Sequence, residues 1–235
     1  MSDKINPKIA IIDYGMGNLF SVQQACLHTE LDAVITSDKK ELLDADAAIL
    51  PGVGAFGNAM DNLQKLDLIS PIKDFIASGR QFYGICLGMQ LLMSESEEFG
   101  NHSGLNLIKG RVVKFPGKDN EDRKIKVPQI GWNSIKRPGV NFKNAWDDSP
   151  LKNIKDNEFM YFVHSYYAKP SDQSVVLSKT VYEGTEYCSS VKLGKNIFAS
   201  QFHPERSAEK GLNIYKNWKQ IIKEKKELIK HENRN

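Results

Sequence analysis

Residues Gln81–Gly88 read QFYGICLG. The apolar run Gln81–Ile85 is typical of a strand buried on both faces, and the segment Leu87–Glu97 predicts a helix directly after it. Glycines on either side of Cys86 predict a sharp turn from strand to helix, with the cysteine at its tip. A buried strand that leads at once into a helix indicates a parallel sheet covered by helices.

The alternation of strand and helix extends through the first hundred residues. Strands are expected at Lys8–Ile12, Ala33–Thr36, Ala47–Leu50 and Gln81–Ile85, and helices at Leu19–Glu30 (capped by Asn18), Ala55–Leu66, Pro71–Ser78 and Leu87–Glu97. This order predicts right-handed βαβ units. The fold class is therefore α/β, with a doubly wound, mostly parallel sheet and helices on both of its faces.

Beyond Gly100 strands dominate, and we expect additional antiparallel strands in the C-terminal half. The strand-like runs are Arg111–Phe115, Gly131–Ile135, Phe159–Ala168, Val175–Val181, Glu186–Leu193 and Ile197–Phe202, with a hairpin turn at Leu193–Asn196 and a charged loop at Lys118–Lys126. Tyr215, Trp218, Ile222 and Ile229 share one face of a final helix. Residues 1–235 are predicted to form a single domain that ends in a Lys-rich helix or tail at about 216–235.

Composition excludes several classes of protein. Of the 235 residues 40% are hydrophobic and 26% charged, with no apolar run of membrane length and no signal-peptide core near Met1. The net charge of +3 arises in the segment Lys216–Asn235, which carries +4, so the body offers no basic face to a nucleic acid. Cys26, Cys86 and Cys188 form no CxxC pair, which argues against a disulfide framework or a cysteine zinc site and favours the cytoplasm.

The turn at Cys86 is a candidate nucleophile site. A sulfur beside the first N–H groups of a helix is favoured as a thiolate. The N–H of Leu87, the residue after the cysteine, is placed to stabilise an oxyanion. On this pentapeptide alone, a buried structural cysteine explains the pattern equally well.

A candidate base follows the strand Ile197–Phe202. Pro204 restricts His203 to an extended conformation, in which residues two apart point to the same side. His203 and Glu205 can therefore face one site, with the carboxylate orienting the imidazole. A lone histidine here would be an ordinary loop residue, but with Cys86 the three side chains predict a catalytic triad.

A glycine-rich loop, Pro51–Gly57, follows the strand Ala47–Leu50. Loops at the carboxyl ends of parallel strands line the ligand crevice, so the N–H of Val53 or Gly54 is expected to help hold an oxyanion. The loop lacks both the G-K-[ST] of a phosphate loop and the G-x-G-x-x-G of a dinucleotide site.

Several of these strings together resemble a known family. The strings GICLGMQLL around Cys86, PGVGAF and FHPE resemble the triad-type glutamine amidotransferases. The strings DYGMGNL (Asp13–Leu19), GWN (Gly131–Asn133) and YFVHSY (Tyr161–Tyr166) are similar to one branch, the glutaminase subunits of imidazole glycerol phosphate synthases from histidine biosynthesis. The resemblance runs from about Lys8 to Trp218.

The resemblance implies a role for each matching residue. Cys86 would be the nucleophile that attacks L-glutamine and forms a thioester, His203 the acid and base, and Glu205 its partner. The residues implied in binding glutamine are Gln90 and Glu98 at its amino-acid end and the His164, Ser165 and Tyr166 segment at its carboxylate. No metal or organic cofactor is implied.

The resemblance also implies a partner. Ammonia would pass to a separate (β/α)-barrel synthase subunit in a heterodimer, which makes imidazole glycerol phosphate and aminoimidazole carboxamide ribotide. Residues near the implied interface are Asn18, Trp132, Tyr161 and Arg206. Gln129 and Arg206 stand where the family usually has His and Lys. The alternative of a related subunit that feeds ammonia to a surface-polysaccharide sugar pathway therefore stays open. The hypotheses of a non-catalytic partner and of a cysteine peptidase leave more of the motifs unexplained.

Overall fold

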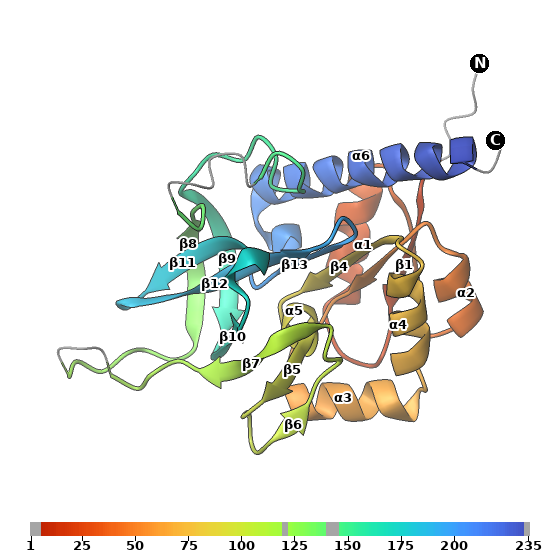
Figure 1. Ribbon diagram of the computed structural model, residues 1–235. Coiled ribbons are helices and arrows are strands. Elements are labelled where there is room, and N and C mark those ends of the chain that lie inside the picture. The colour runs from red at the N-terminus through yellow and green to blue at the C-terminus, as the bar shows by residue number, and fades with distance from the viewer. Residues whose placement is uncertain (1–5, 119–121, 140–145, 233–235) are drawn as a thin grey trace.

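The computed structural model describes residues 6–118, 122–139 and 146–232, with backbone alone for 228–232. Its central sheet has seven strands, in the order β11 (Val176–Tyr182), β12 (Thr185–Leu193), β13 (Ile197–Ser200), β4 (Gln81–Ile85), β3 (Ala47–Leu50), β1 (Lys8–Ile12) and β2 (Asp32–Thr36). The neighbours from β13 to β2 are parallel, and β11, β12 and β13 are antiparallel. The predicted doubly wound sheet with added antiparallel strands is confirmed (Figure 1).

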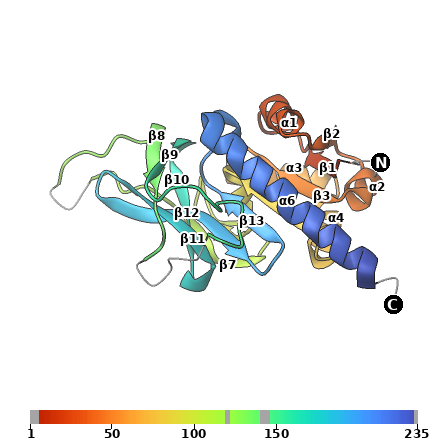
Figure 2. The ribbon, with the colours of Figure 1, turned by 90° about the horizontal axis from the view of Figure 1, so that it is seen from above.

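Helices cover both faces of this sheet, and each face has its own apolar core. The helices are α1 (Leu19–His28), α2 (Lys39–Asp44), α3 (Phe56–Lys65), α4 (Ile69–Ala77), α5 (Leu87–Leu91) and α6 (Ala208–Glu232). The side chains of α1 and α6 pack in one core, and those of α2 to α5 pack in the other. Figure 2, seen from above, shows the long helix α6 lying across the molecule in front of the central sheet. Asn18 caps α1 as predicted, because its Oδ1 accepts the N–H of Ser21.

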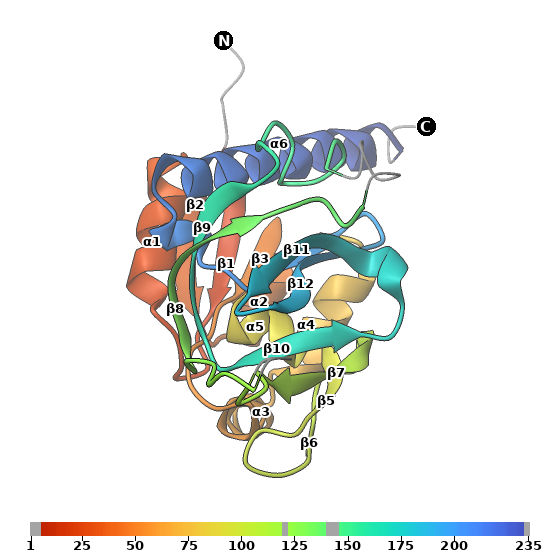
Figure 3. The same cartoon turned by 90° about the vertical axis from the view of Figure 1, so that its left-hand side faces the viewer.

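Two smaller sheets lie beside the central one. The first has four strands in the order β10 (Tyr166–Pro170), β7 (Ile108–Lys114), β5 (Met93–Ser96) and β6 (His102–Ser103). The second pairs β8 (Gln129–Ile135) with β9 (Glu158–His164) in antiparallel register. Figure 3 views the molecule from the side of these strands. Both small sheets lie next to the end of the central sheet at which the residues of the sequence motifs around Cys86 and His203 are found.

Two predicted elements are wrong in part. The helix expected at Leu87–Glu97 ends at Leu91, and Met93–Ser96 forms β5, because pairing with β7 outweighs the local helical pattern. The strand expected at Phe159–Ala168 is broken at Ser165 into β9 and β10, which belong to different sheets. The short helix α2, capped by Asp38, was not predicted.

The C-terminal helix α6 is not only a surface tail, because part of it is buried against the central sheet. Tyr215, Trp218 and Ile222 are buried against the sheet, which confirms the predicted apolar face as far as Ile222. The side chain of Ile229 and the last residues of the predicted Lys-rich tail lie outside the described residues. Among the described residues, no helix is both long and apolar enough to cross a membrane.

Candidate active site

Cys86 lies in a tight turn between β4 and α5. Its backbone has φ 54° and ψ −108°, a conformation that side-chain-bearing residues rarely adopt. Gly88 makes the turn possible, because a Cβ there would overlap the carbonyl oxygen of Leu50. The N–H of Cys86 bonds to the carbonyl of Ser200 at 2.7 Å, which fixes the turn to the end of β13. The sulfur therefore stands at the carboxyl end of the parallel strands.

His203 and Glu205 follow the end of β13 on the same side. His203 is extended (φ −100°, ψ 95°), as Pro204 requires, and its Nδ1 lies 2.7 Å from Oε1 of Glu205. The side chains of both residues are buried. The imidazole Nε2 is buried too and has no conventional hydrogen-bond partner among the described residues, so it is left for the Cys86 sulfur.

Electrostatics couple this imidazole to the sulfur. Burial by itself lowers the pKa of His203, but the negative charge and hydrogen bonding of Cys86, followed by those of Glu205, outweigh it and raise the pKa to about 11. His203 therefore stays protonated through neutral pH. An imidazolium held by a carboxylate and directed at a sulfur is the arrangement needed to deliver a proton to a leaving group.

A cavity of about 460 Å³ opens beside the sulfur, within the usual range for small-molecule sites. Its lining includes Val53, Gly54, Cys86, Leu87, Gln90, Glu98, Phe99, Pro128, Val163, His164, Ser165 and Tyr166. The fold thus brings the predicted oxyanion residues and all five predicted glutamine-binding residues around one space.

Gln90 and Glu98 each have part of their polar capacity already used. The side-chain N–H₂ of Gln90 donates to the carbonyl of Tyr166 at 2.8 Å and to Oε1 of Gln201 at 3.0 Å. One carboxylate oxygen of Glu98 accepts the N–H of Phe56 at 2.7 Å, at the first residue of α3. Both residues line the cavity, and the amide oxygen of Gln90 and the second carboxylate oxygen of Glu98 are acceptors of the kind that suits a substrate ammonium.

His164 is held as a neutral side chain. Its Nδ1 lies 2.9 Å from the carbonyl of Tyr166 and its Nε2 lies 3.3 Å from the hydroxyl of Tyr187, which also contacts Gln129. Burial lowers the pKa of His164 to about 3. Because both ring nitrogens are engaged, the segment from His164 to Tyr166 offers the cavity its backbone and not this imidazole.

The loop at Pro51–Gly54 lies against the turn. The hydroxyl of Tyr14 donates to the carbonyl of Pro51 at 2.8 Å, and a Cβ on Gly52 would overlap that hydroxyl. The N–H of Leu87 donates to the carbonyl of Gly52 at 3.4 Å. That N–H is therefore occupied by the loop, and a shift of the loop is needed before it can serve an oxyanion.

An apolar face lies on the outer side of the β8–β9 pair, and we call it the outer face. Ile130, Trp132 and Phe159 on it are more than half exposed. The guanidinium of Arg206 lies 4.4 Å from the ring centre of Tyr161, and the rings of Trp132 and Tyr161 are 6.2 Å apart. Three of the four predicted interface residues are thus neighbours. The fourth, Asn18, is exposed at the start of α1 and caps it.

The outer face connects directly to the triad. The N–H of His203 donates to the carbonyl of Tyr161 at 2.9 Å, and the Cys86 sulfur lies 4.0 Å from the carbonyl of Val163. Both carbonyls belong to β9, so this strand joins the exposed apolar side chains to the base and the nucleophile.

Gln201 is a site residue that sequence reasoning missed. It is fully buried, and its side-chain N–H₂ donates to the Cys86 sulfur at 3.6 Å. A signal was present, because Gln201 lies only two residues before His203 in the segment that follows β13. Beyond His203 the chain forms a short 3-10 turn at Pro204–Arg206, within which Glu205 contacts the imidazole.

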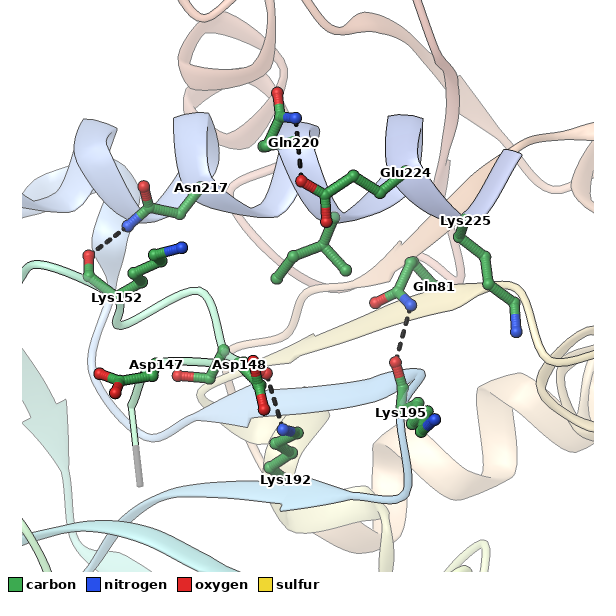
Figure 4. A pocket seen from close by; sticks show the side chains of 12 residues that line it. Gln81, Asp147, Asp148, Lys152, Lys192, Lys195, Asn217, Gln220, Glu224 and Lys225 are labelled. Carbon is green, nitrogen blue, oxygen red and sulfur yellow. Dashed lines mark hydrogen bonds between the residues drawn. The ribbon is translucent and has the colours of Figure 1, made fainter. Parts of the chain in front are cut away.

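A second cavity, of about 440 Å³, lies at the opposite end of β4, between α6 and the β12–β13 turn (Figure 4). Its charged residues are Asp147, Asp148, Lys152, Lys192, Lys195, Glu224 and Lys225. Four lysines against three carboxylates leave little net charge, so the cavity favours neither an anion nor a cation. Among the described residues, no group of three or more His, Cys, Asp or Glu is arranged to hold a metal ion.

Comparison with known families gives the site its context. Residues 10–220 match the family described as glutamine amidotransferase class-I. The chain belongs to this family. It is therefore a glutamine amidotransferase.

Curated relatives of this amidotransferase cover nearly its whole length. It is 47% identical over 214 residues to imidazole glycerol phosphate synthase subunit HisH of Geobacter sulfurreducens, across 90% of this chain and 97% of that one. The subunit of the same name from Aquifex aeolicus is 45% identical, across 90% and 96%. The chain is thus similar to these subunits over about nine tenths of its length.

Solved structures agree on the fold of the amidotransferase. PurLQS from Thermotoga maritima superposes with a TM-score of 0.68 at 19% identity, over 94% of this chain and 99% of that one. A glutamine amidotransferase from the same organism gives 0.57 at 16% identity, over 94% and 86%. At these identities the likeness concerns the fold alone.

Proposed function

We propose that this amidotransferase is the glutaminase subunit of an imidazole glycerol phosphate synthase, which supplies ammonia for histidine biosynthesis in the cytoplasm. The observation that carries the proposal is the buried His203–Glu205 pair directed at the Cys86 sulfur beside a cavity of substrate size. The similarity to HisH subunits over nearly the whole chain supports the pathway. The same similarity favours histidine biosynthesis over the alternative of a surface-polysaccharide sugar pathway.

The first chemical step makes a thioester. The Cys86 thiolate attacks the side-chain carboxamide carbon of glutamine, and the C–N bond breaks as His203 gives its proton to the departing ammonia. The raised pKa of His203 supports this role, because the proton is present at neutral pH when the leaving group needs it. Glu205 stabilises the imidazolium and fixes its orientation.

The second step hydrolyses the thioester. Neutral His203 takes a proton from a water molecule, which attacks the acyl carbon and releases glutamate. The tetrahedral intermediate then collapses and the sulfur leaves as thiolate, while His203 keeps the proton that it took from water, so the starting ion pair is restored. The released carboxylic acid ionises in solvent. Acyl and proton transfer need only these side chains and an oxyanion site.

Glutamine is proposed to lie with its amino-acid end away from the sulfur. The free oxygens of Gln90 and Glu98 would accept hydrogen bonds from its ammonium group. The backbone of the His164–Tyr166 segment would contact its carboxylate. This orientation leaves the carboxamide at Cys86.

The loop Pro51–Gly54 supplies a means of control. With the N–H of Leu87 bonded to the carbonyl of Gly52, one oxyanion donor is occupied. We infer that docking of the synthase subunit shifts this loop, which frees Leu87 and directs the N–H of Val53 or Gly54 to the oxyanion. Glutamine hydrolysis would then be slow until a partner is present to use the ammonia.

The partner is proposed to be a separate (β/α)-barrel synthase subunit that docks on the outer face. Exposed apolar side chains ringed by polar ones are typical of a protein interface, and Trp, Tyr and Arg are the residues most often found at its centre. Trp132, Tyr161 and Arg206 supply all three types. Asn18 is next to Gly17, which approaches the proposed oxyanion loop at Gly52, and this supports the proposal that Asn18 also belongs to the docking surface.

The test is glutamate release from glutamine by wild type and by Cys86→Ala, each mixed with the candidate synthase partner and its nucleotide ligand. The wild-type pair should release glutamate, and the Cys86→Ala pair should lose at least about a thousandfold of that rate. Equal release by the two pairs would end the proposal of cysteine catalysis.

The pathway is tested separately, in a histidine auxotroph that lacks the corresponding subunit. The wild-type gene should restore growth without histidine, and the Cys86→Ala gene should restore it only when ammonium is abundant. Failure of the wild-type gene to complement, although the purified pair hydrolyses glutamine, would direct attention to a different ammonia acceptor.

A further inference from the structure

Gln201 joins the nucleophile to the glutamine-binding segment through an unbroken row of hydrogen bonds. The row runs from the carbonyl of Tyr166 to the amide of Gln90 at 2.8 Å, on to Oε1 of Gln201 at 3.0 Å, and from its Nε2 to the Cys86 sulfur at 3.6 Å. The four groups come from β10, α5, the end of β13 and the turn after β4. The amides of Gln90 and Gln201 are both buried, so water does not compete for these bonds.

The direction of every bond in the row is fixed from one end. The Tyr166 carbonyl can only accept, so the Gln90 side chain must direct its N–H₂ at it. The second N–H of that group then points at Gln201, which must turn its own oxygen toward it. As a result, Gln201 presents its N–H to the sulfur. If it presented its oxygen to the sulfur instead, its N–H₂ would face the N–H₂ of Gln90, and two donors would meet without an acceptor between them.

The Gln201 amide is therefore a direct donor to the sulfur, at 3.6 Å. The imidazolium of His203 acts on the same sulfur through its charge. A hydrogen bond from a buried N–H to an anion is stronger than one to a neutral acceptor, so it favours the charged form of that acceptor. The Gln201 bond thus acts on thiolate more than on thiol.

We propose that Gln201 is a positioning residue that stabilises the Cys86 thiolate and orients it toward the substrate carboxamide. The proposal deepens the glutaminase mechanism above and rests on Cys86 being its nucleophile. Because Gln90 both bounds the cavity and orients Gln201, the same bonds also set the distance between the bound amino acid and the sulfur.

The readout is the pH dependence of Cys86 alkylation by iodoacetamide, measured on the full chain alone, without glutamine or partner. Alkylation is followed at the Cys86 peptide by mass spectrometry, and Cys86→Ala gives the background from the buried Cys26 and Cys188. Gln201→Met removes the donor with little change in volume. The midpoint of the profile should rise by about one pH unit, and the rate at neutral pH should fall about tenfold.

Two further variants keep the result interpretable. Gln90→Met leaves Gln201 in place but removes the bond that orients it, so the midpoint should rise by a smaller amount in the same direction. Gln81→Met is the matched control, because Gln81 is also buried and bonds a backbone carbonyl, that of Lys195, at the far end of β4. It should alter thermal stability and leave the alkylation midpoint at the wild-type value.

The proposal is overturned if folded Gln201→Met and folded Gln90→Met both keep the wild-type midpoint, or if Gln81→Met shifts it as far as Gln201→Met does. If Gln201→Met fails to fold, the Gln90→Met profile alone decides. Because no glutamine or partner is present, these outcomes are independent of glutamate release, and an inactive wild-type pair would count against the proposed function without altering the alkylation comparison.

Discussion

His164 is the residue whose charge state the fold controls most strictly outside the triad. It lies in a buried polar network with Tyr187 and the carbonyl of Tyr166, and aromatic rings of Phe115 and Phe162 pack around it. None of these groups is a carboxylate that could compensate a second proton. Protonating His164 therefore places an uncompensated charge under the glutamine-binding segment.

Because His164 is buried, we expect the stability of the folded state to fall as the pH is lowered. An unfolded histidine has a pKa near 6.5, whereas burial lowers the pKa of His164 to about 3. Above pH 6.5 neither the folded nor the unfolded chain binds this proton, so the contribution of neutral His164 to the free energy of unfolding is complete. Between pH 6.5 and about 3 only the unfolded chain binds it, so the free energy of unfolding should fall by about 1.4 kcal/mol per pH unit from this group.

The measurement is denaturant unfolding of wild type and His164→Gln at pH 7.5 and pH 4.5. Glutamine can replace both hydrogen bonds without titrating, so the variant should lose less stability between the two pH values than wild type does. His28→Gln, which removes an exposed histidine from α1, serves as control. Equal acid losses in wild type and His164→Gln would show that His164 does not cause this fall in stability.

Among single residues, the sequence predicted the triad and most of the residues that line the cavity, but it missed Gln201 and Tyr187. Cys86, His203 and Glu205 carry local signals, namely flanking glycines and a proline between the two partners. Gln201 and Tyr187 acquire their roles from residues 115 and 58 positions away in the chain, Cys86 and Gln129. Such contacts follow from the sheet order and register, which short motifs do not encode.

Among the elements, the turn from β4 to α5 tolerates little change. Gly88 packs its α-carbon against the backbone of Leu50 in the neighbouring strand β3, so an added methyl meets a carbonyl and not a flexible side chain. Relief would require β3 or α5 to move, and both are buried on every side.

Gly88→Ala is therefore expected to destabilise the protein by more than about 3 kcal/mol or to prevent folding. Gly117→Ala is the matched control, because a Cβ at Gly117 meets nothing within 4 Å. Thermal unfolding distinguishes the two, and a melting temperature for Gly88→Ala within a few degrees of that of Gly117→Ala would contradict the packing described here.

The elements that were predicted correctly are those with a local pattern. Parallel strands that are buried on both faces are continuous apolar runs, and α1 begins at a recognisable cap. The boundary between α5 and β5 was not predicted, because the residues from Leu87 to Met93 are buried in either structure and only the pairing with β7 separates them. The break at Ser165 likewise depends on two different partners, β8 and β7.

For the molecule as a whole, the outer face is the proposed docking surface for the synthase subunit. Trp132→Ala should leave thermal stability nearly unchanged, because the side chain is about half exposed. The same change should weaken binding of the synthase subunit by about 30-fold, or about 2 kcal/mol, as expected for a tryptophan at the centre of an interface.

Isothermal titration of the synthase subunit measures this effect. Leu66→Ala is the control, because Leu66 is similarly exposed but lies at the C-terminal end of α3, away from the outer face. Unchanged affinity for Trp132→Ala, or an equal loss for Leu66→Ala, would place the docking surface elsewhere.

The order of strands and helices in the first half was enough to predict the doubly wound sheet, since right-handed crossovers leave few arrangements. The smaller sheets were predicted as strands without partners. The pairing of β8 with β9 brings Trp132 opposite Tyr161 across a gap in sequence that includes residues outside the described ranges. That residues 1–235 form a single domain stays a prediction.

The alternation along β9 has a consequence for how such an enzyme can diversify. Phe159 and Tyr161 point outward, whereas Met160, Phe162 and His164 are buried. Alternate positions of this one strand thus serve two roles, the proposed recognition of another protein and the support of the chemistry. A designer, or natural drift, can exchange the odd-numbered side chains to recruit a new recipient of ammonia while the even-numbered ones keep the hydrolytic apparatus intact.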